Sequence, residues 1–167
     1  MTGADNQQER LDGYIAGYVD GEGSFSVSVQ HNRSCRVGFQ LVPEFHVSQN
    51  GDRAQVLEII RGRLGCGYIK PNSKTDRALV FVVRDRDELQ THVLPFFEQY
   101  PLLSSKRADF EKFAYVVRAM ASGRHRTPAG FGELLDVALS MSGSGRNRKV
   151  RWKELVALQN PQRLHAR

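Results

Sequence analysis

The chain has 167 residues, of which 40% are hydrophobic and 25% charged, and both fractions are ordinary for a globular protein with one substantial core. It has no apolar run long enough to span a membrane, its first ten residues are polar, and two cysteines are too few for a disulfide framework, so we expect a soluble intracellular protein without a membrane partner. The net charge of +6 is uneven, because residues 1–100 hold 11 Lys or Arg against 13 Asp or Glu, whereas residues 101–167 hold 13 against 5; this excess suits a polyanionic partner.

The first predicted element is a helix with two contrasting faces that ends near residues 21–23. Apolar residues recur at helical spacing along one face: Leu11, Tyr14, Ile15, Tyr18 and Val19. The other face carries almost no side chain: Gly13, Ala16, Gly17 and Asp20. Since a helical glycine costs about 1 kcal/mol relative to alanine, we expect a second backbone to approach this strip closely; a loosely packed helix is the alternative.

Two acids, Asp20 and Glu22, follow where this helix ends. The C-terminal end of a helix carries partial negative charge, so carboxylates are electrostatically misplaced there. If two such helices pack as a symmetric pair, four carboxylates crowd one region, and a divalent cation such as Mg²⁺ would offset their repulsion. The alternative is a pair of solvated turn acids.

Residues 15–23, Ile-Ala-Gly-Tyr-Val-Asp-Gly-Glu-Gly, together with the following Ser24 and Phe25, resemble the motif of the LAGLIDADG homing endonucleases position by position. Because one copy of the motif is present, the resemblance implies a homodimer that meets at Gly13, Ala16, Gly17 and Asp20. It also implies that Glu22, where the family usually has aspartate, and the backbone carbonyl of Gly21 hold the catalytic Mg²⁺, for which Mn²⁺ can substitute.

The remaining pattern predicts strands over residues 24–30 and 37–49, with Pro43 at a sheet edge or a bulge, and then a helix over 53–64. Two further strands follow at 68–70 and 77–83, then a helix over 87–98 broken near Pro95 and a helix that starts at Ser104 or Ser105. A helix at 131–141, a flexible stretch at 142–145 and a cationic cluster at 146–153 before a last helix complete the chain. The resemblance implies an α+β fold with an αββαββα core and a saddle-shaped, four-stranded antiparallel sheet. We expect one domain over 1–167, with its core at about 8–120 and a basic helical extension at about 121–167.

The outward residues of the predicted strands are mostly polar, and the resemblance places this face on double-stranded DNA. The candidates for base contacts are Ser26, Ser28, Gln30, Asn32, Ser34, Gln40, His46, Lys70, Asn72 and Arg77. The alternative is the wet face of an ordinary antiparallel sheet. Glu44 on this face has two readings, a contact to cytosine or an ion pair within the protein.

Three further residues match family positions around the scissile phosphates. Lys106 lies in the pattern Leu102, Lys106, Asp109, Phe110, and the resemblance implies that it stabilises charge on the phosphate. In the same way Gln49 would order a water molecule and Arg53 would bind phosphate. Glu22, Gln49, Arg53 and Lys106 are therefore the candidate catalytic residues.

The sequence thus predicts a Mg²⁺-dependent, site-specific DNA endonuclease of the intron-homing type that cuts a long pseudo-palindromic target and leaves short 3′ overhangs. The alternatives are an RNA maturase that binds intron RNA and assists splicing, or a DNA-binding regulator that does not cut. A third reading is a monomeric nucleic-acid binder that uses only residues 122–153.

Overall fold

A computed structural model of the chain describes residues 3–73 and 77–141, and its elements follow the predicted αββαββα order. The elements are α1 (Gly3–Glu22), β1 (Gly23–His31), β2 (Phe39–Asn50), η1 (Gly51–Arg53), α2 (Gln55–Leu64), β3 (Tyr68–Pro71), β4 (Ala78–Val83), α3 (Arg86–Glu88), η2 (Leu89–Val93), α4 (Leu94–Gln99), α5 (Lys106–Ala121), η3 (Arg124–Arg126) and α6 (Pro128–Ser140). The predictions for residues 142–145, 146–153 and the last helix lie outside the described residues.

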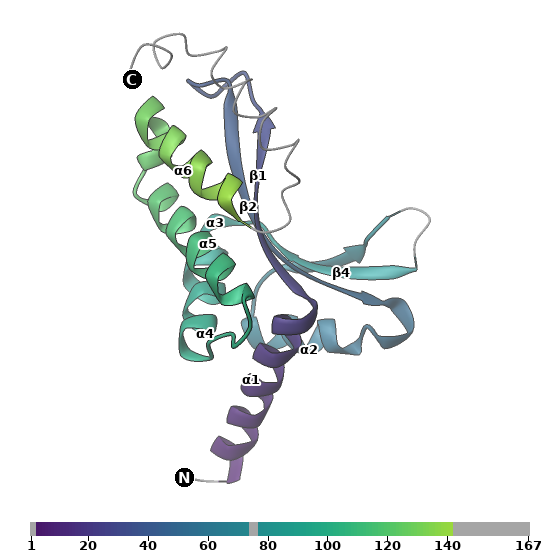
Figure 1. Cartoon of the computed structure of the whole chain (residues 1–167). Coiled ribbons are helices and arrows are strands. Elements are labelled where there is room, and N and C mark those ends of the chain that lie inside the picture. The colour runs from purple at the N-terminus through teal and green to yellow at the C-terminus, as the bar shows by residue number, and fades with distance from the viewer. Residues whose placement is uncertain (1–2, 74–76, 142–167) are drawn as a thin grey trace.

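The four strands form one antiparallel sheet in the order β1-β2-β4-β3. β1 pairs over its full length with the Phe39–Val47 part of β2, with Ser26 opposite Glu44 and Gln30 opposite Gln40. β4 pairs only with the Phe45–Asn50 half of β2, so within the described residues the Phe39–Glu44 half has β1 as its single neighbour. Pro43 lies in that half, which confirms an edge position. Figure 1 shows the sheet bending, so that the β1–β2 hairpin and the β3–β4 end diverge around a concave face.

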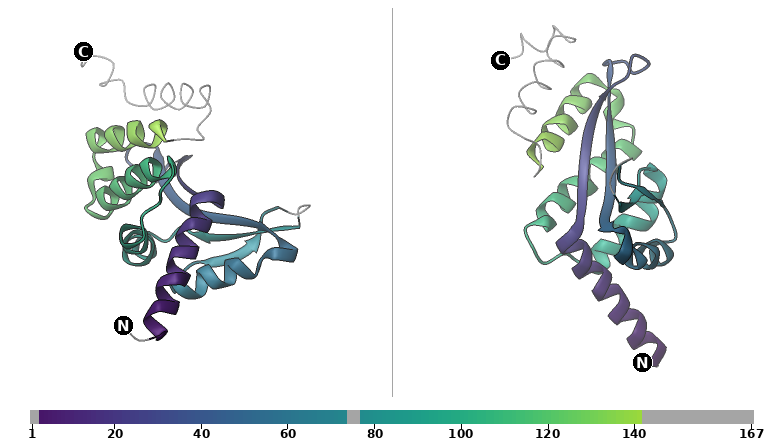
Figure 2. Two further views of the ribbon diagram at one scale, coloured as in Figure 1. Left: turned by 60° about the horizontal axis from the view of Figure 1, so that its bottom comes forward. Right: turned by 90° about the vertical axis from the view of Figure 1, so that its right-hand side faces the viewer.

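The helices cover the opposite, convex face of the sheet (Figure 2), and the apolar side chains of alternate strand positions pack beneath them. The larger cluster centres on aromatic rings, with Phe25 stacked on Phe45 at 4.9 Å and in edge contact with Phe97 at 5.3 Å between ring centroids. A second cluster joins the outer half of the β1–β2 hairpin to α5 and α6 through residues such as Leu41 and Phe131. The hairpin is therefore held to the helices along its whole length.

The buried face of α1 differs from the predicted stripe. Asp12, Ile15, Ala16 and Val19 are buried, whereas Tyr14 is 52% exposed, so the prediction for Tyr14 was wrong. The stripe is rotated because Asp12 points inward, where Arg63 of α2 holds both carboxylate oxygens at 2.5 and 2.9 Å. An ion pair between a buried carboxylate and a partly exposed arginine thus replaces an apolar contact between α1 and α2.

The helical stretch from α3 to α4 is interrupted just before Pro95, as predicted, by a π-helical segment that ends at Val93. Proline lacks the N–H that bonds the preceding turn, and here the turn before it, η2, widens to a π-helix, so that Pro95 takes a position in the first turn of α4.

At the end of α2, Gly65 adopts a left-handed conformation with φ 69° and its N–H bonds to the Arg61 carbonyl, a common helix stop.

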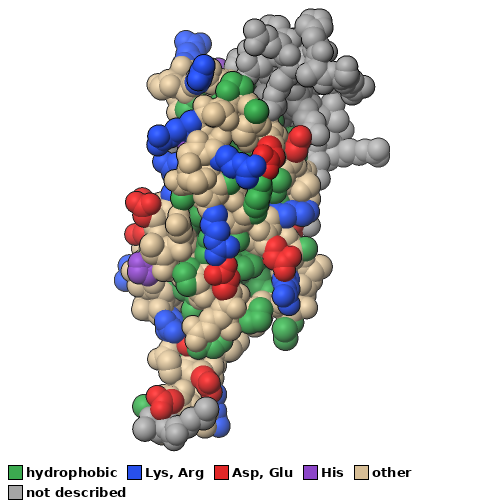
Figure 3. All heavy atoms as spheres, turned by 90° about the vertical axis from the view of Figure 1, so that its left-hand side faces the viewer, with side chains coloured by type: hydrophobic (Ala, Val, Ile, Leu, Met, Phe, Trp, Pro, Cys, Tyr) green, Lys and Arg blue, Asp and Glu red, His purple; other side chains and the backbone are tan. Residues whose placement is uncertain are grey.

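The surface of the helical layer mixes acids, bases and apolar groups, as Figure 3 shows. Several of these charges are paired, including Arg118 with Glu98, and Arg124 with Glu133. In the described part of the chain, no helix combines the length and the apolar character needed to cross a membrane.

Candidate functional site

The site is built around the C-terminal end of α1, where the chain passes directly into β1. Gly23 makes this transition possible, since a Cβ there would lie 2.6 Å from the Val19 side chain and 2.8 Å from its carbonyl oxygen. The passage leaves Gly21 and Glu22 exposed on the surface. Glu22 makes no hydrogen bond or salt bridge within the described residues, so its carboxylate is available to a ligand.

The carboxylate of Asp20 is bound within its own chain. One oxygen accepts hydrogen bonds from the N–H groups of Leu103 and Ser104 at 3.0 and 2.9 Å, and the other accepts from the Ser104 hydroxyl. Burial alone would raise the pKa of Asp20, but these bonds and the charge of Lys106 outweigh it and lower the pKa. Asp20 therefore ties the loop before α5 to the end of α1.

Lys106 extends this tie to the first residue of α5. Its N–H donates to the Ser104 hydroxyl at 3.1 Å, and its Nζ donates to the Val19 carbonyl oxygen at 2.9 Å. Burial lowers the pKa of Lys106, against the opposing charges of Asp20 and Glu22. The structure thus brings Lys106 to Glu22, two residues that lie 84 positions apart in the sequence.

Gln49, at the end of β2, contacts the same turn of α1. Its side-chain amide donates to the Tyr18 hydroxyl, and its Oε1 accepts from the Asn50 N–H at 2.7 Å. Arg53 lies beyond it in η1 and is exposed. The link into η1 is close to the start of β4, because the Gly51 N–H donates to the Arg77 carbonyl at 3.1 Å.

The described residues of one chain do not assemble a complete metal site, since they contain no group of three or more His, Cys, Asp or Glu side chains arranged to hold an ion. Asp20 is committed to the loop before α5. The oxygen donors that remain are the Glu22 carboxylate and the Gly21 carbonyl, hard ligands of the kind Mg²⁺ binds. Their number fits a cation that takes its other ligands from water, from phosphate or from a second chain.

Three glycines on the exposed side of α1 are not required by close packing against any described part of the chain. A Cβ at Gly13, Gly17 or Gly21 would meet nothing within 4 Å. Ala16, which was expected on this strip, is only 7% exposed and packs inside the chain. The exposed strip of small residues is therefore Gly13, Gly17 and Gly21, with Tyr14 beside it.

Most predicted base-contacting residues lie on the concave face or at its rim, and several are already connected to one another. Gln40 accepts from Asn32 at 2.8 Å and donates to Gln30 at 3.3 Å, and the Asn32 side chain also accepts from the Ser34 N–H at 3.0 Å. The Ser28 hydroxyl donates to the Val42 carbonyl. The other members of the set, at least partly exposed, are Ser26, His46, Lys70, Asn72 and Arg77.

The middle of the concave face holds an ionic group that the sequence left open. Glu44 pairs with His46 Nδ1 at 3.1 Å and with Arg84, which decides between its two readings in favour of the ion pair. The adjacent His46 ring and then the bond and charge of Arg84 lower the pKa of Glu44 to about 2. β4 adds no polar group here, because Val80 and Val82 lie on this face and are buried.

Sequence reasoning missed Tyr18, Ser104 and Arg84 as partners of site residues. Ser104 was identified only as a helix cap, although the same hydroxyl also binds Asp20. Tyr18 was assigned to the apolar stripe and Arg84 was not considered. Nothing in the sequence alone joins either residue to its partner across the fold.

A family model described as "LAGLIDADG endonuclease" matches residues 15–117. A curated relative from Neurospora crassa, "Probable intron-encoded endonuclease 2", is 33% identical over 149 residues, which cover 87% of this chain and 32% of the relative. The chain therefore spans about a third of that protein.

Two solved structures share the fold. The homing endonuclease I-TnaI superimposes with a TM-score of 0.81 at 35% identity, over 87% of this chain and 97% of its own. The I-LtrWI LAGLIDADG homing endonuclease, crystallised with its target DNA, gives a TM-score of 0.80 at 33% identity, over 86% of this chain and 49% of its own. The concave sheet and the end of α1 lie within the residues that the family model matches.

Proposed function

This chain belongs to the LAGLIDADG endonuclease family, and on that premise we propose that it is a homing endonuclease that cuts double-stranded DNA at a specific site as a homodimer. The observation that carries the proposal is the end of α1. There, a free carboxylate on Glu22 stands beside the cation of Lys106 and at the end of a glycine strip that one chain leaves uncovered.

The same glycine strip is evidence for the second chain of the proposed homodimer. Three helical glycines without neighbours lower the stability of the isolated chain by about 3 kcal/mol relative to alanine, and close packing of two α1 helices would offset this loss. Apolar side chains flank the strip, since Tyr14 is 52% exposed and Leu103, beside Asp20, is 92% exposed. The chain also matches about half of the DNA-bound I-LtrWI protein, so a second copy would supply an equivalent other half.

In the dimer, each chain contributes one Glu22 and one Gly21 carbonyl to hold a divalent cation, Mg²⁺ or Mn²⁺. When bound, such a cation polarises the scissile phosphate and lowers the pKa of water. Lys106 places positive charge where the phosphate gains negative charge, and its bond to Val19 holds it there. Gln49, fixed by Tyr18 and Asn50, keeps a lone pair with which to orient a water molecule, and exposed Arg53 binds a neighbouring phosphate.

The concave face reads the DNA. Gln30, Asn32 and Gln40 form one bonded array on the β1–β2 hairpin, and such amides match the edges of adenine. Because the two chains are related by symmetry, the target is expected to be pseudo-palindromic. One cut per chain, each by its own Glu22, gives short 3′ overhangs as the expected product.

The test is cleavage of a plasmid that carries the uninterrupted host sequence into which this reading frame is inserted. We expect linear product in Mg²⁺ or Mn²⁺ with the natural protein and with Glu22→Asp, which keeps the carboxylate, and none with Glu22→Gln. Glu9→Gln on the exposed start of the same helix is the matched control and should cut normally. Specific binding of the plasmid without any cleavage in either metal would overturn the proposal.

A further inference from the structure

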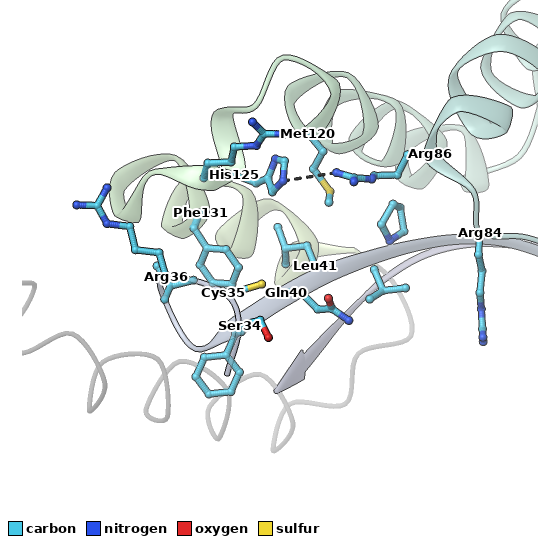
Figure 4. Close-up of a pocket in the computed structure, with 15 residues that line it drawn as sticks. Ser34, Cys35, Arg36, Gln40, Leu41, Arg84, Arg86, Met120, His125 and Phe131 are labelled. Atoms are coloured by element: carbon cyan, nitrogen blue, oxygen red, sulfur yellow. Dashed lines mark hydrogen bonds between the residues drawn. The ribbon is translucent and has the colours of Figure 1, made fainter. Parts of the chain in front are cut away.

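A pocket of about 620 Å³ lies along the Phe39–Glu44 half of β2, where β4 no longer pairs. Apolar side chains of β2, α5 and α6 form its interior, namely Phe39, Leu41, Pro43, Met120 and Phe131. Figure 4 shows this interior between the strand and the helical layer, with the hairpin turn at one side. The pocket therefore belongs mainly to the convex side of the sheet and lies apart from the end of α1.

Arginines from three separate segments line this pocket. Arg36 comes from the hairpin turn, Arg84 and Arg86 from the link after β4 and the start of α3, and Arg126 from η3. Arg84 is neutralised by Glu44 on the concave face. The other three are exposed and pair with no carboxylate in the described part of the chain, and no described Asp or Glu lines the pocket. By contrast, both arginines of α5 are each paired with a glutamate.

Two of these cations converge on one imidazole ring. Arg86 Nη1 lies 3.5 Å from His125 Nε2, as the dashed line in Figure 4 marks. The pKa of His125 is lowered, first by burial and then by the charges of Arg86 and Arg126. The ring is thus kept neutral beside two guanidinium groups, and positive charge is left concentrated at the mouth of an apolar pocket.

We propose that this pocket binds a nucleoside phosphate, with the phosphate on the Arg36, Arg86 and Arg126 rim and the base against the apolar interior. The volume is that of a small-ligand site, and arginine matches the geometry of phosphate oxygens. The source is either a free mononucleotide or an unpaired nucleotide of a single strand, because a stacked duplex cannot place one base in the pocket. This function is additional to DNA cleavage, and its arginine rim and apolar interior contain none of the residues assigned to cleavage. Ser34 and Gln40, which are proposed to face DNA, also line the pocket.

The experiment uses the full chain and two pairs of substitutions with the same loss of charge. Arg86→Gln with Arg126→Gln removes two rim cations, whereas Arg61→Gln with Arg118→Gln removes two exposed arginines elsewhere. The probes are fluorescent single-stranded RNA and DNA oligonucleotides in excess unlabelled duplex, AMP, and inorganic phosphate. Binding is followed by anisotropy and by the His125 ring resonances in NMR, which are assigned with His125→Gln.

We expect oligonucleotide or AMP to shift the His125 resonances, and the rim pair to weaken binding by at least about tenfold while the control pair does not. For a single strand, the slope of log K against log salt should fall by about 1.4 on losing two phosphate contacts. If AMP shifts the His125 resonances and the oligonucleotide does not, the ligand is a free nucleotide. If both shift them, the pocket also accepts an unpaired nucleotide of a single strand.

Three results would overturn the proposal: equal affinity for inorganic phosphate and AMP, displacement by a polyglutamate peptide as effective as by oligonucleotide, or equal weakening by the rim and control pairs. Plasmid cleavage by the rim variant is expected to match that of the natural protein, so failure of this proposal is distinguishable from failure of the proposed nuclease.

Discussion

Lys106 closes the C-terminal end of α1, since its Nζ donates a 2.9 Å hydrogen bond to the carbonyl oxygen of Val19. A cation at that end of a helix compensates the partial negative charge of its last carbonyls. The same ammonium group is held beside Glu22, the residue expected to bind metal. One side chain therefore stabilises the helix end and supplies charge to the site.

Replacing Lys106 by methionine should lower single-turnover DNA cleavage by about tenfold to hundredfold, because a hydrogen bond from a charged group contributes about 1.5–3 kcal/mol. Lys112 is the matched control. It lies six residues further along the same helix, and its Nζ donates to the Ser140 carbonyl of α6 at 2.9 Å. Lys112→Met should cost similar stability and leave the cleavage rate unchanged, and equal losses of rate would contradict the assignment.

The hydrogen bonds of Asp20 should affect the cleavage rate, because they hold the loop that positions Lys106. Asp20→Ala removes three hydrogen bonds, so we expect the free energy of unfolding to fall by about 1–3 kcal/mol and kcat to fall while DNA affinity stays constant. Ser104→Ala, which removes only the hydroxyl, should show a smaller version of both effects. A parallel loss of DNA affinity in Asp20→Ala would show instead that the carboxylate contributes to binding.

The contacts of Glu44 should make the free energy of unfolding depend on pH in the acidic range. The folded pKa of about 2 lies below the ordinary value of 4.5, so the folded chain binds fewer protons than the unfolded chain between these values. Its stabilisation is complete above the ordinary pKa and is lost as the pH falls towards 2. Urea unfolding at about pH 5 and about pH 3 should therefore show a smaller loss of stability in Glu44→Gln than in the natural protein. An identical loss in both would place the acid sensitivity elsewhere.

The glycine strip predicts opposite results for two leucine substitutions. A Cβ at Gly17 of α1 or at Gly62 of α2 meets nothing within 4 Å, and leucine is the better helix former by about 1 kcal/mol. Gly62→Leu should raise the melting temperature and leave the dimer intact. Gly17→Leu should yield a well-folded monomer in light scattering and abolish cleavage. A dimer that survives Gly17→Leu would exclude this strip as the interface.

The ion pair of Asp12 and Arg63 should contribute more to the free energy of unfolding than an exposed ion pair does. Asp12 is fully buried, so Arg63→Ala leaves a buried carboxylate without its cation and should cost about 3–5 kcal/mol in thermal or urea unfolding. The exposed pair of Glu58 and Arg61 is the comparison, and Glu58→Ala should cost about 0.5 kcal/mol or less. Costs of the same size would mean that Asp12 is accessible to water in solution.

Local patterns in the sequence were sufficient for the element order, and the family resemblance added the four-stranded antiparallel sheet. The alternation from Ser24 to Gln30 identifies both faces of β1, and the glycines after Leu64 mark the end of α2. Pro43 was correctly placed at an edge because a proline offers no N–H to a neighbouring strand. These features depend on residues that are close in sequence.

Features that join distant segments were not predictable in the same way. Asp12 looked like a polar interruption of a helix, and only the fold brings Arg63 to it. Asp20 was assigned to the dimer interface. Its actual partners lie in a loop more than 80 positions away, and the sequence does not show that the two segments meet. The partner of Glu44 could not be chosen from the sequence, since an outward carboxylate on a strand suits a base or an arginine equally well. Pairing of charges depends on three-dimensional distance, which periodicity does not encode.

Among the described residues, the Phe39–Glu44 half of β2 has a single neighbouring strand, and this bears on aggregation. An unpaired strand edge is a template on which another chain can add a strand, and such addition leads to aggregation. Pro43 sits in the middle of that half and withholds one of the N–H groups that an incoming strand would need. The edge can therefore stay open without recruiting further copies of the chain.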